Sequence, residues 1–308
     1  MKVYPITPRG YCKGVVHAIE LAKRCAHDYP DTPIHILGMI VHNQYIVDAL
    51  AQMGIHTVDQ PGLSRLELLD QIDEGIVLIT AHGAGQDVFD KAQAKGLTII
   101  DATCTDVIKT HTLIKTALDA QQEILYIGKK GHPEAEGTIA IDPEHIHLIT
   151  SKQDIDAIQN HDQAYLITNQ TTMSLWDVYD LCEYAQKKLP NIQIAKETCQ
   201  ATRIRQEAIA KVPEEVELVI IVGDPHSNNT AKLAAIASQK AHKEVIQIES
   251  VQDLSLDVLK GKSCVAISSG ASTPTYLTNQ IIAYLQTLEA PVQSLPPFPS
   301  IDKKHILD

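Results

Sequence analysis

The sequence predicts an α/β protein made of three pseudo-threefold-related α/β domains, each with a small parallel sheet, around a central cavity. Apolar runs typical of buried strands alternate with helical patterns along all 308 residues, separated by Gly, Pro, Asn and Asp. Cys12, Cys104 and Cys199 each lie between such a strand and such a helix, at nearly equal separations of 92 and 95 residues. This regular spacing indicates a triplicated unit.

The composition narrows the range of functions. The chain is 44% hydrophobic, enough for a large core, and its net charge of -12 argues against a nucleic-acid binder. No apolar run approaches the roughly 18 residues of a membrane span, and we expect no signal or transit peptide because the chain enters a strand at once. Six cysteines without a Cys-x-x-Cys pair favour a reduced, cytoplasmic protein, so any metal site must combine distant parts of the chain.

The first unit, residues 1–96, sets the order of elements. An apolar strand is followed by a cysteine and a helix, and then by two further strands that each end in a polar loop. These features are the strand Val3–Ile6, Cys12, the strand Ile34–Leu37 with His42 and Asn43, and the strand Ile76–Thr80 with His82.

The second and third units, residues 97–191 and 192–290, repeat this order. The second unit has the strand Leu97–Ile100, Cys104, the strand Ile124–Ile127 with His132 and Glu134, and the strand Ala164–Thr168 with Thr171. The third unit has the strand Ile192–Ala195, Cys199, the strand Leu218–Val222 with Ser227, Asn228 and Asn229, and the strand Cys264–Ser268 with Ser272. Residues 291–308 are proline-rich at their start, and we interpret them as a strap or lid without a core of its own.

Parallel sheets place these loops where ligands bind, beyond the carboxyl ends of the strands. If the three sheets turn those ends toward one centre, nine polar loops line one cavity and the three cysteines meet there. A helix N-terminus favours the thiolate, which is the form that binds metal. Each cysteine taken alone could instead be an ordinary buried thiol, which is our interpretation of Cys25, Cys182 and Cys264.

Three thiolates can hold an iron-sulfur cluster or a zinc ion. Clusters that only transfer electrons generally have four cysteine ligands, so three would leave one iron with an open position. An open iron is a Lewis acid, which favours redox or dehydration chemistry at a C–O bond. Zinc with three thiolates and a water is the alternative, although catalytic zinc sites more often use His and carboxylate ligands.

The other loops are rich in neutral hydrogen-bond donors. Several of these donors precede helices, where free backbone N–H groups add to anion binding, so the set suits a diphosphate or a carboxylate. The alternative is that they only cap helices. The donors are His42, Asn43, His82, Ser227, Asn228, Asn229 and Ser272.

Glu134 is the carboxylate best placed among these loops. In a water-poor pocket it can stay protonated and deliver protons, and Gly131 and Pro133 would hold it in a fixed turn. Alternatively, Glu134 and Glu136 cap the segment that follows.

With these motifs in place, the chain resembles the 4-hydroxy-3-methylbut-2-enyl diphosphate reductase family, which catalyses the last step of the non-mevalonate isoprenoid pathway. The resemblance extends over nearly the whole chain, from the segment before Cys12 to Ser272. Its most specific motifs are Val41-His42-Asn43, Ala81-His82-Gly83, Asp101-Ala102-Thr103-Cys104, Gly131-His132-Pro133-Glu134-Ala135-Glu136-Gly137, Gln170-Thr171-Thr172 and Arg205-Gln206-Glu207-Ala208.

The resemblance implies a trefoil of three α/β domains around a 4Fe-4S cluster with three cysteine ligands and one open iron. The substrate would lose its hydroxyl as water, using two electrons and two protons, and give isopentenyl and dimethylallyl diphosphate. Ferredoxin or flavodoxin would supply the electrons. By motif, the cluster ligands would be Cys12, Cys104 and Cys199; the catalytic residues Glu134, His132 and Thr171; and the substrate contacts His42, His82, His132, Thr171, Ser227, Asn228, Asn229 and Ser272.

The chain also departs from the family pattern beside these sites. Thr105 stands where proline is common, Asn228 replaces a serine, and Lys13 and His17 replace a small residue and an arginine. Two other functions stay open. One is a quinolinate-synthase-like dehydratase, which needs no external electrons; the other is an iron-sulfur sensor or diphosphate-binding protein, which has no need for Glu134 and Thr171.

Overall fold

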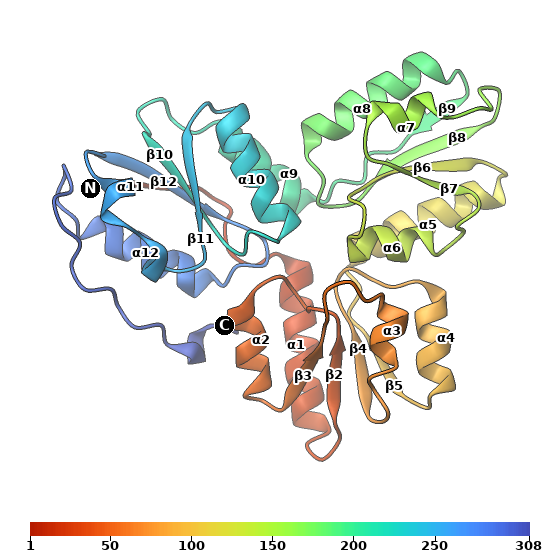
Figure 1. Cartoon of the computed structure of the whole chain (residues 1–308), viewed down its shortest axis with the longest axis horizontal. Coiled ribbons are helices and arrows are strands. Elements are labelled where there is room, and N and C mark those ends of the chain that lie inside the picture. The colour runs from red at the N-terminus through yellow and green to blue at the C-terminus, as the bar shows by residue number, and fades with distance from the viewer. The chain divides into compact units, whose positions relative to one another are not determined.

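The computed structural model describes residues 1–308 and contains three four-stranded sheets (Figure 1). The strand orders are β1-β12-β10-β11, β3-β2-β4-β5 and β7-β6-β8-β9, and all paired strands run parallel. This arrangement confirms the predicted α/β class with small parallel sheets. No helix combines the length and the hydrophobicity that crossing a bilayer requires.

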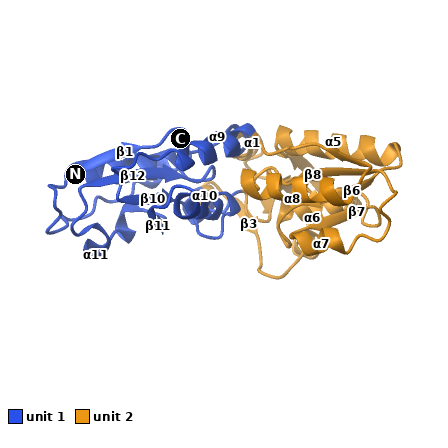
Figure 2. Ribbon diagram, turned by 90° about the horizontal axis from the view of Figure 1, so that it is seen from above, with its two compact units in different colours: residues 1–16, 41–49, 200–308 blue, residues 17–40, 50–199 orange.

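The chain forms two compact units, which we describe separately (Figure 2). Unit 1 comprises residues 1–16, 41–49 and 200–308, and unit 2 comprises residues 17–40 and 50–199. The division into domains at 1–96, 97–191 and 192–290 with a tail at 291–308 stays a prediction.

Unit 1 contains one sheet, whose central strand β10 is apolar and buried at every position. This pattern is typical of a parallel strand that helices cover on both faces. The strands are β1 (Lys2–Pro5), β10 (Leu218–Val222), β11 (Glu244–Ile248) and β12 (Cys264–Ser269). The helices of this part of the chain are α9 (Gln200–Ala210), α10 (Asn228–Gln239), η1 (Val251–Asp253), α11 (Leu256–Leu259) and α12 (Thr275–Gln286).

Unit 2 contains the other two sheets. The first is built from β2 (Ile34–Leu37), β3 (Ile55–Val58), β4 (Ile76–Ile79) and β5 (Thr98–Asp101), with α3 (Arg65–Leu69) and α4 (Gln86–Ala94) between them. The second is built from β6 (Glu123–Ile127), β7 (Ile146–Ile149), β8 (Tyr165–Asn169) and β9 (Ile192–Ile194), with α5 (Thr105–Asp119), α6 (Pro133–Ile139), α7 (Lys152–Asp156) and α8 (Leu175–Lys188). Helices α1 (Lys13–Asp28) and α2 (Gln44–Ala51) each contain residues of both units.

The strand before each cysteine is an edge strand. Strand β1 pairs with β12, β5 with β4, and β9 with β8. Strands β5 and β9 therefore join the sheet of the preceding repeat, and β1 joins the sheet of the third repeat. The sequence pattern had grouped each of them with the strands that follow it. The cause is that a parallel partner is reached through a crossover, so nearness in sequence does not identify it.

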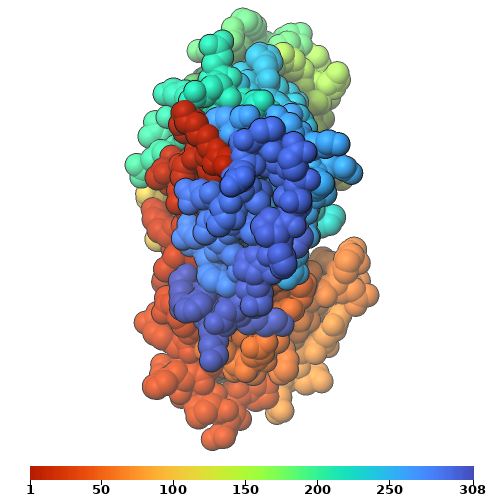
Figure 3. Space-filling model, turned by 90° about the vertical axis from the view of Figure 1, so that its left-hand side faces the viewer, coloured from red at the N-terminus to blue at the C-terminus, as the bar shows by residue number.

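The C-terminal tail packs on the rest of unit 1 and forms no sheet of its own. Val292 and Ile306 are buried, with 1% and 0% of their surface exposed, and the Tyr284 hydroxyl donates to the Pro296 carbonyl at 2.7 Å. The short helix η2 (Lys303–His305) precedes Ile306. Figure 3 shows the C-terminal tail, in dark blue, on the side of the molecule that faces the viewer.

Candidate active site

The three predicted ligand cysteines share one local geometry. The backbone N–H groups of Cys12, Cys104 and Cys199 donate to the carbonyls of Ala271, Ala81 and Thr171 at 3.1, 3.0 and 3.0 Å. Each carbonyl belongs to a tight turn that follows the neighbouring strand, and each cysteine stands directly before a helix: α1, α5 or α9. The triplication inferred from spacing is thus repeated in the hydrogen bonds.

The six cysteines fall into two classes. Cys12, Cys104 and Cys199 are partly exposed and form no disulfide, whereas the other three are buried. Burial raises the pKa of the Cys182 thiol to about 11, and it also raises the pKa of Cys25 and of Cys264. These three buried thiols stay protonated at neutral pH, and only the cysteines of the partly exposed class stand directly before helices.

In unit 2, Glu134 and Thr171 form a buried pair. The Thr171 backbone N–H and hydroxyl donate to the two carboxyl oxygens of Glu134, at 2.7 and 2.9 Å. Glu134 is only 1% exposed, and this burial raises its pKa to about 7, although the two bonds from Thr171 act in the opposite direction. The carboxyl group can therefore hold a proton near neutral pH.

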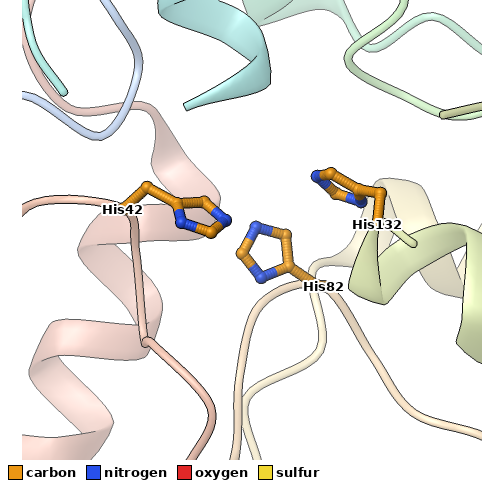
Figure 4. Close-up of side chains that lie close together, drawn as sticks. All are labelled: His42, His82 and His132. Atoms are coloured by element: carbon orange, nitrogen blue, oxygen red, sulfur yellow. The ribbon is translucent and has the colours of Figure 1, made fainter. Parts of the chain in front are cut away.

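His132 stands beside this pair and caps α6. Its Nδ1 accepts from the Glu134 backbone N–H at 3.1 Å, and its ring makes an edge contact with the ring of His82, with centroids 5.3 Å apart. Figure 4 shows the rings of His82 and His132 beside each other, one from the loop after β4 and one from the start of α6. His42, which the figure also labels, belongs to unit 1.

In unit 1, the polar loops after β10 and β12 lie next to each other because these two strands are paired. The hydroxyl oxygens of Ser227 and Ser272 are 3.4 Å apart. Asn228 and Asn229 open α10 and are 6% and 5% exposed, and both polar atoms of the Asn229 amide are buried without a hydrogen-bond partner. Such an amide suits a polar ligand, since an unsatisfied buried group is otherwise costly.

Asn43 in unit 1 has a structural role. It is fully buried, and its side-chain oxygen accepts from the Ile46 N–H at 3.3 Å at the start of α2. The side-chain oxygen of Asn43 thus acts as a cap, while its side-chain nitrogen is buried without a hydrogen-bond partner. The adjacent His42 is only partly buried.

Unit 2 thus brings together Glu134, Thr171, His132 and His82, and unit 1 brings together Ser227, Asn229 and Ser272. The roles of these residues, and the convergence of the three cysteines on one cavity, stay predictions.

Three residues near Glu134 and His82 were missed by the sequence analysis: Arg65, Thr80 and Tyr126. Arg65 donates to the Thr80 hydroxyl, and Tyr126 is fully buried, with its pKa raised by burial and by the charge of Glu134. Two of them left a signal in the sequence. Tyr126 interrupts an apolar strand, and Arg65 follows the capping Ser64, a place where the helix dipole disfavours a cation.

The comparisons of this chain with known proteins agree with one another. Residues 3–286 match the family described as LytB protein. A 4-hydroxy-3-methylbut-2-enyl diphosphate reductase of Brevibacillus brevis is 47% identical over 290 residues, covering 94% of this chain and 93% of the relative. The corresponding protein of Exiguobacterium sibiricum is 45% identical over 311 residues, covering 100% and 98%.

Two solved structures are also similar. The E-1-hydroxy-2-methyl-but-2-enyl-4-diphosphate reductase of Plasmodium falciparum has a TM-score of 0.87 and 28% identity, with 99% of this chain and 96% of that chain covered. A structure of (E)-4-hydroxy-3-methyl-but-2-enyl diphosphate reductase, described as the terminal enzyme of the non-mevalonate pathway, has a TM-score of 0.65 and 27% identity, with 94% and 100% covered.

Proposed function

The chain belongs to the LytB protein family, and from this premise we propose that it reductively dehydroxylates 4-hydroxy-3-methylbut-2-enyl diphosphate to isopentenyl and dimethylallyl diphosphate. The reaction consumes two electrons and two protons and releases the hydroxyl as water. It would be the terminal step of the non-mevalonate pathway, as the name of the similar solved structure states for that protein.

The cofactor would be a 4Fe-4S cluster held by Cys12, Cys104 and Cys199. The donor set suits it, because these are the partly exposed cysteines and each precedes a helix N-terminus with the same backbone bond. When bound, such a cluster supplies electrons one at a time and an iron without a protein ligand. Ferredoxin or flavodoxin would deliver the electrons.

The single observation that carries the proposal is the buried Glu134–Thr171 pair. With a pKa of about 7, Glu134 is protonated in a large fraction of molecules at neutral pH. When Glu134 is protonated, its hydrogen bond with the Thr171 hydroxyl reverses, so that the carboxyl group donates to the Thr171 hydroxyl oxygen 2.9 Å away. The Thr171 hydroxyl can then donate its own proton to the leaving oxygen of the substrate and receive the Glu134 proton in its place. The carboxylate left behind is stabilised by the Thr171 N–H.

The diphosphate would be bound by the neutral donors. Ser227, Ser272, Asn228 and Asn229 lie at the start of α10 or in the adjacent loop, where the helix N-terminus adds free N–H groups. The imidazoles of His42, His82 and His132 would donate to the remaining oxygens. Neutral donors hold an anion without a buried cation having to be desolvated.

The test is conversion of the substrate by the anaerobically purified protein. With a chemical reductant or reduced ferredoxin, we expect isopentenyl and dimethylallyl diphosphate, and without a reductant we expect no turnover. Turnover that needs no reductant would contradict the proposal and favour a dehydratase.

A further inference from the structure

Arg65 is a partly buried cation in an unusual place. It is the first residue of α3, directly after Ser64, whose hydroxyl and backbone form a capping box with Glu67. A positive charge at a helix N-terminus is disfavoured by the helix dipole, so an arginine at this position indicates a role other than stabilising the helix. Burial lowers the pKa of Arg65 to about 10, opposed by the charges of Glu136 and Asp59, so the guanidinium stays charged at neutral pH.

The guanidinium of Arg65 closes the turn that carries His82. One of its NH2 groups donates to the Gly83 carbonyl and the other to the Thr80 hydroxyl oxygen, the latter at 2.7 Å. Within the turn, the Gly83 N–H donates to the Thr80 carbonyl at 3.0 Å. Gly83 has φ +74°, and a Cβ there would lie 3.1 Å from a methyl group of Thr103. Arg65 therefore holds a residue on each side of His82, namely Thr80 and Gly83.

These bonds also favour one way for His82 to carry its proton. The Thr80 side chain is fully buried, and its oxygen accepts from Arg65, so its one hydroxyl proton is available for the Nδ1 of His82, 3.3 Å away. A neutral imidazole that accepts at Nδ1 carries its own proton on Nε2.

The ring of His132 also accepts a hydrogen bond at Nδ1, but from a backbone donor. Its Nδ1 accepts from the Glu134 backbone N–H at 3.1 Å, which again leaves the proton on Nε2. The two adjacent rings would each offer an N–H donor, and neither Nε2 would have a lone pair for a metal ion. Two Nε2–H donors of this kind can hydrogen-bond to an anion.

We propose that Arg65 and Thr80 are positioning residues that hold His82 as a neutral imidazole with its proton on Nε2, directed at the diphosphate. The identity of the anion rests on the proposed function; the tautomer does not. Arg65 acts through the buried hydroxyl of Thr80, and this role needs no contact between either residue and the substrate.

The tautomer can be measured by NMR of the ring nitrogens in 15N-histidine-labelled protein, with H82Q used to assign the His82 signals. In the wild type we expect the Nε2-protonated form. T80V keeps the shape of the side chain but removes the hydroxyl, and R65M removes the donor to it, so both should give a mixture of tautomers. T80S should keep the wild-type form.

A matched control is T168V. Thr168 is also a buried threonine near the end of a central strand, in β8, but its hydroxyl has no hydrogen-bond partner, so the His82 signals should not change. If His82 carries its proton on Nδ1 in the wild type, or if T80V leaves its tautomer unchanged, the proposal is wrong. This holds whether or not the protein turns over the substrate.

Inorganic pyrophosphate tests the consequence for binding. Calorimetric titration of the holoenzyme should show an about tenfold higher Kd for T80V, with T80S and T168V within about twofold of the wild type. In turnover, T80V should raise KM more than it lowers kcat. A wild type that does not bind pyrophosphate would contradict the diphosphate site of the proposed function, while T80V binding as tightly as T80S would contradict the inferred role of Thr80.

Discussion

The buried carboxyl of Glu134 is the residue on which proton delivery depends. The substitution E134Q keeps the size and a polar side chain but removes the proton that can be donated. We expect kcat to fall by about 10²–10⁴-fold, the usual range for loss of a general acid, while substrate binding is retained. Turnover assays and titration with substrate check this result, and turnover close to that of the wild type would rule out the assigned role.

The raised pKa of Glu134 also predicts that the stability of the folded protein depends on pH. Because burial raises the pKa of Glu134 from 4.5 to about 7, the folded state binds its proton more tightly than the unfolded state. Its contribution to stability is therefore full below pH 4.5 and is lost as the pH rises through 7. E134Q does not titrate, so the stability of the wild type relative to E134Q should fall by about 3 kcal/mol between pH 4 and pH 8.

Denaturant unfolding of both proteins at these two pH values measures the difference. Other titrating groups are common to the two proteins and cancel. A relative stability that stays constant would show that Glu134 titrates normally in the folded state.

At the scale of elements, the C-terminal tail is fixed to unit 1 by a few buried side chains. Ile306 is fully buried, although it follows a proline-rich segment and only a short helix. We expect I306A to lower the free energy of unfolding by about 2–5 kcal/mol, the cost of removing a buried isoleucine side chain. The control is I301A, at a half-buried position in the same tail, with a smaller loss. Equal effects of the two substitutions in thermal unfolding would mean that the tail is not held through Ile306.

The strand–turn–helix segments could be predicted from the sequence. The cysteines before α1, α5 and α9, and the polar loops after the strands, were located by apolar runs and helical spacing alone. The sheet that each edge strand joins was not predicted. Strand β1 finds its partner β12 about 260 residues away, and β5 and β9 pair with the strand before them, although the repeat pattern groups them with the strands after them. Arg65 and Thr80 were missed because their importance lies in contacts across loops.

At the scale of the whole molecule, the same strand–turn–helix unit occurs three times. The class and the three parallel sheets were predictable, because the pattern of strands, helices and cysteines recurs at a nearly constant period. The Glu134–Thr171 pair could be predicted as two residues of one site through the resemblance to the family. Its geometry, and the burial that raises the Glu134 pKa, needed the folded chain.

The central claim is that Cys12, Cys104 and Cys199 together hold a 4Fe-4S cluster. It is tested most directly by iron and sulfide analysis of the anaerobically purified protein and of single cysteine variants. We predict about four iron and four sulfide per chain, lost in C12S, C104S and C199S and retained in C25A, C182A and C264A. A colourless protein that contains only zinc, or iron content unaffected by the first three substitutions, would contradict the account.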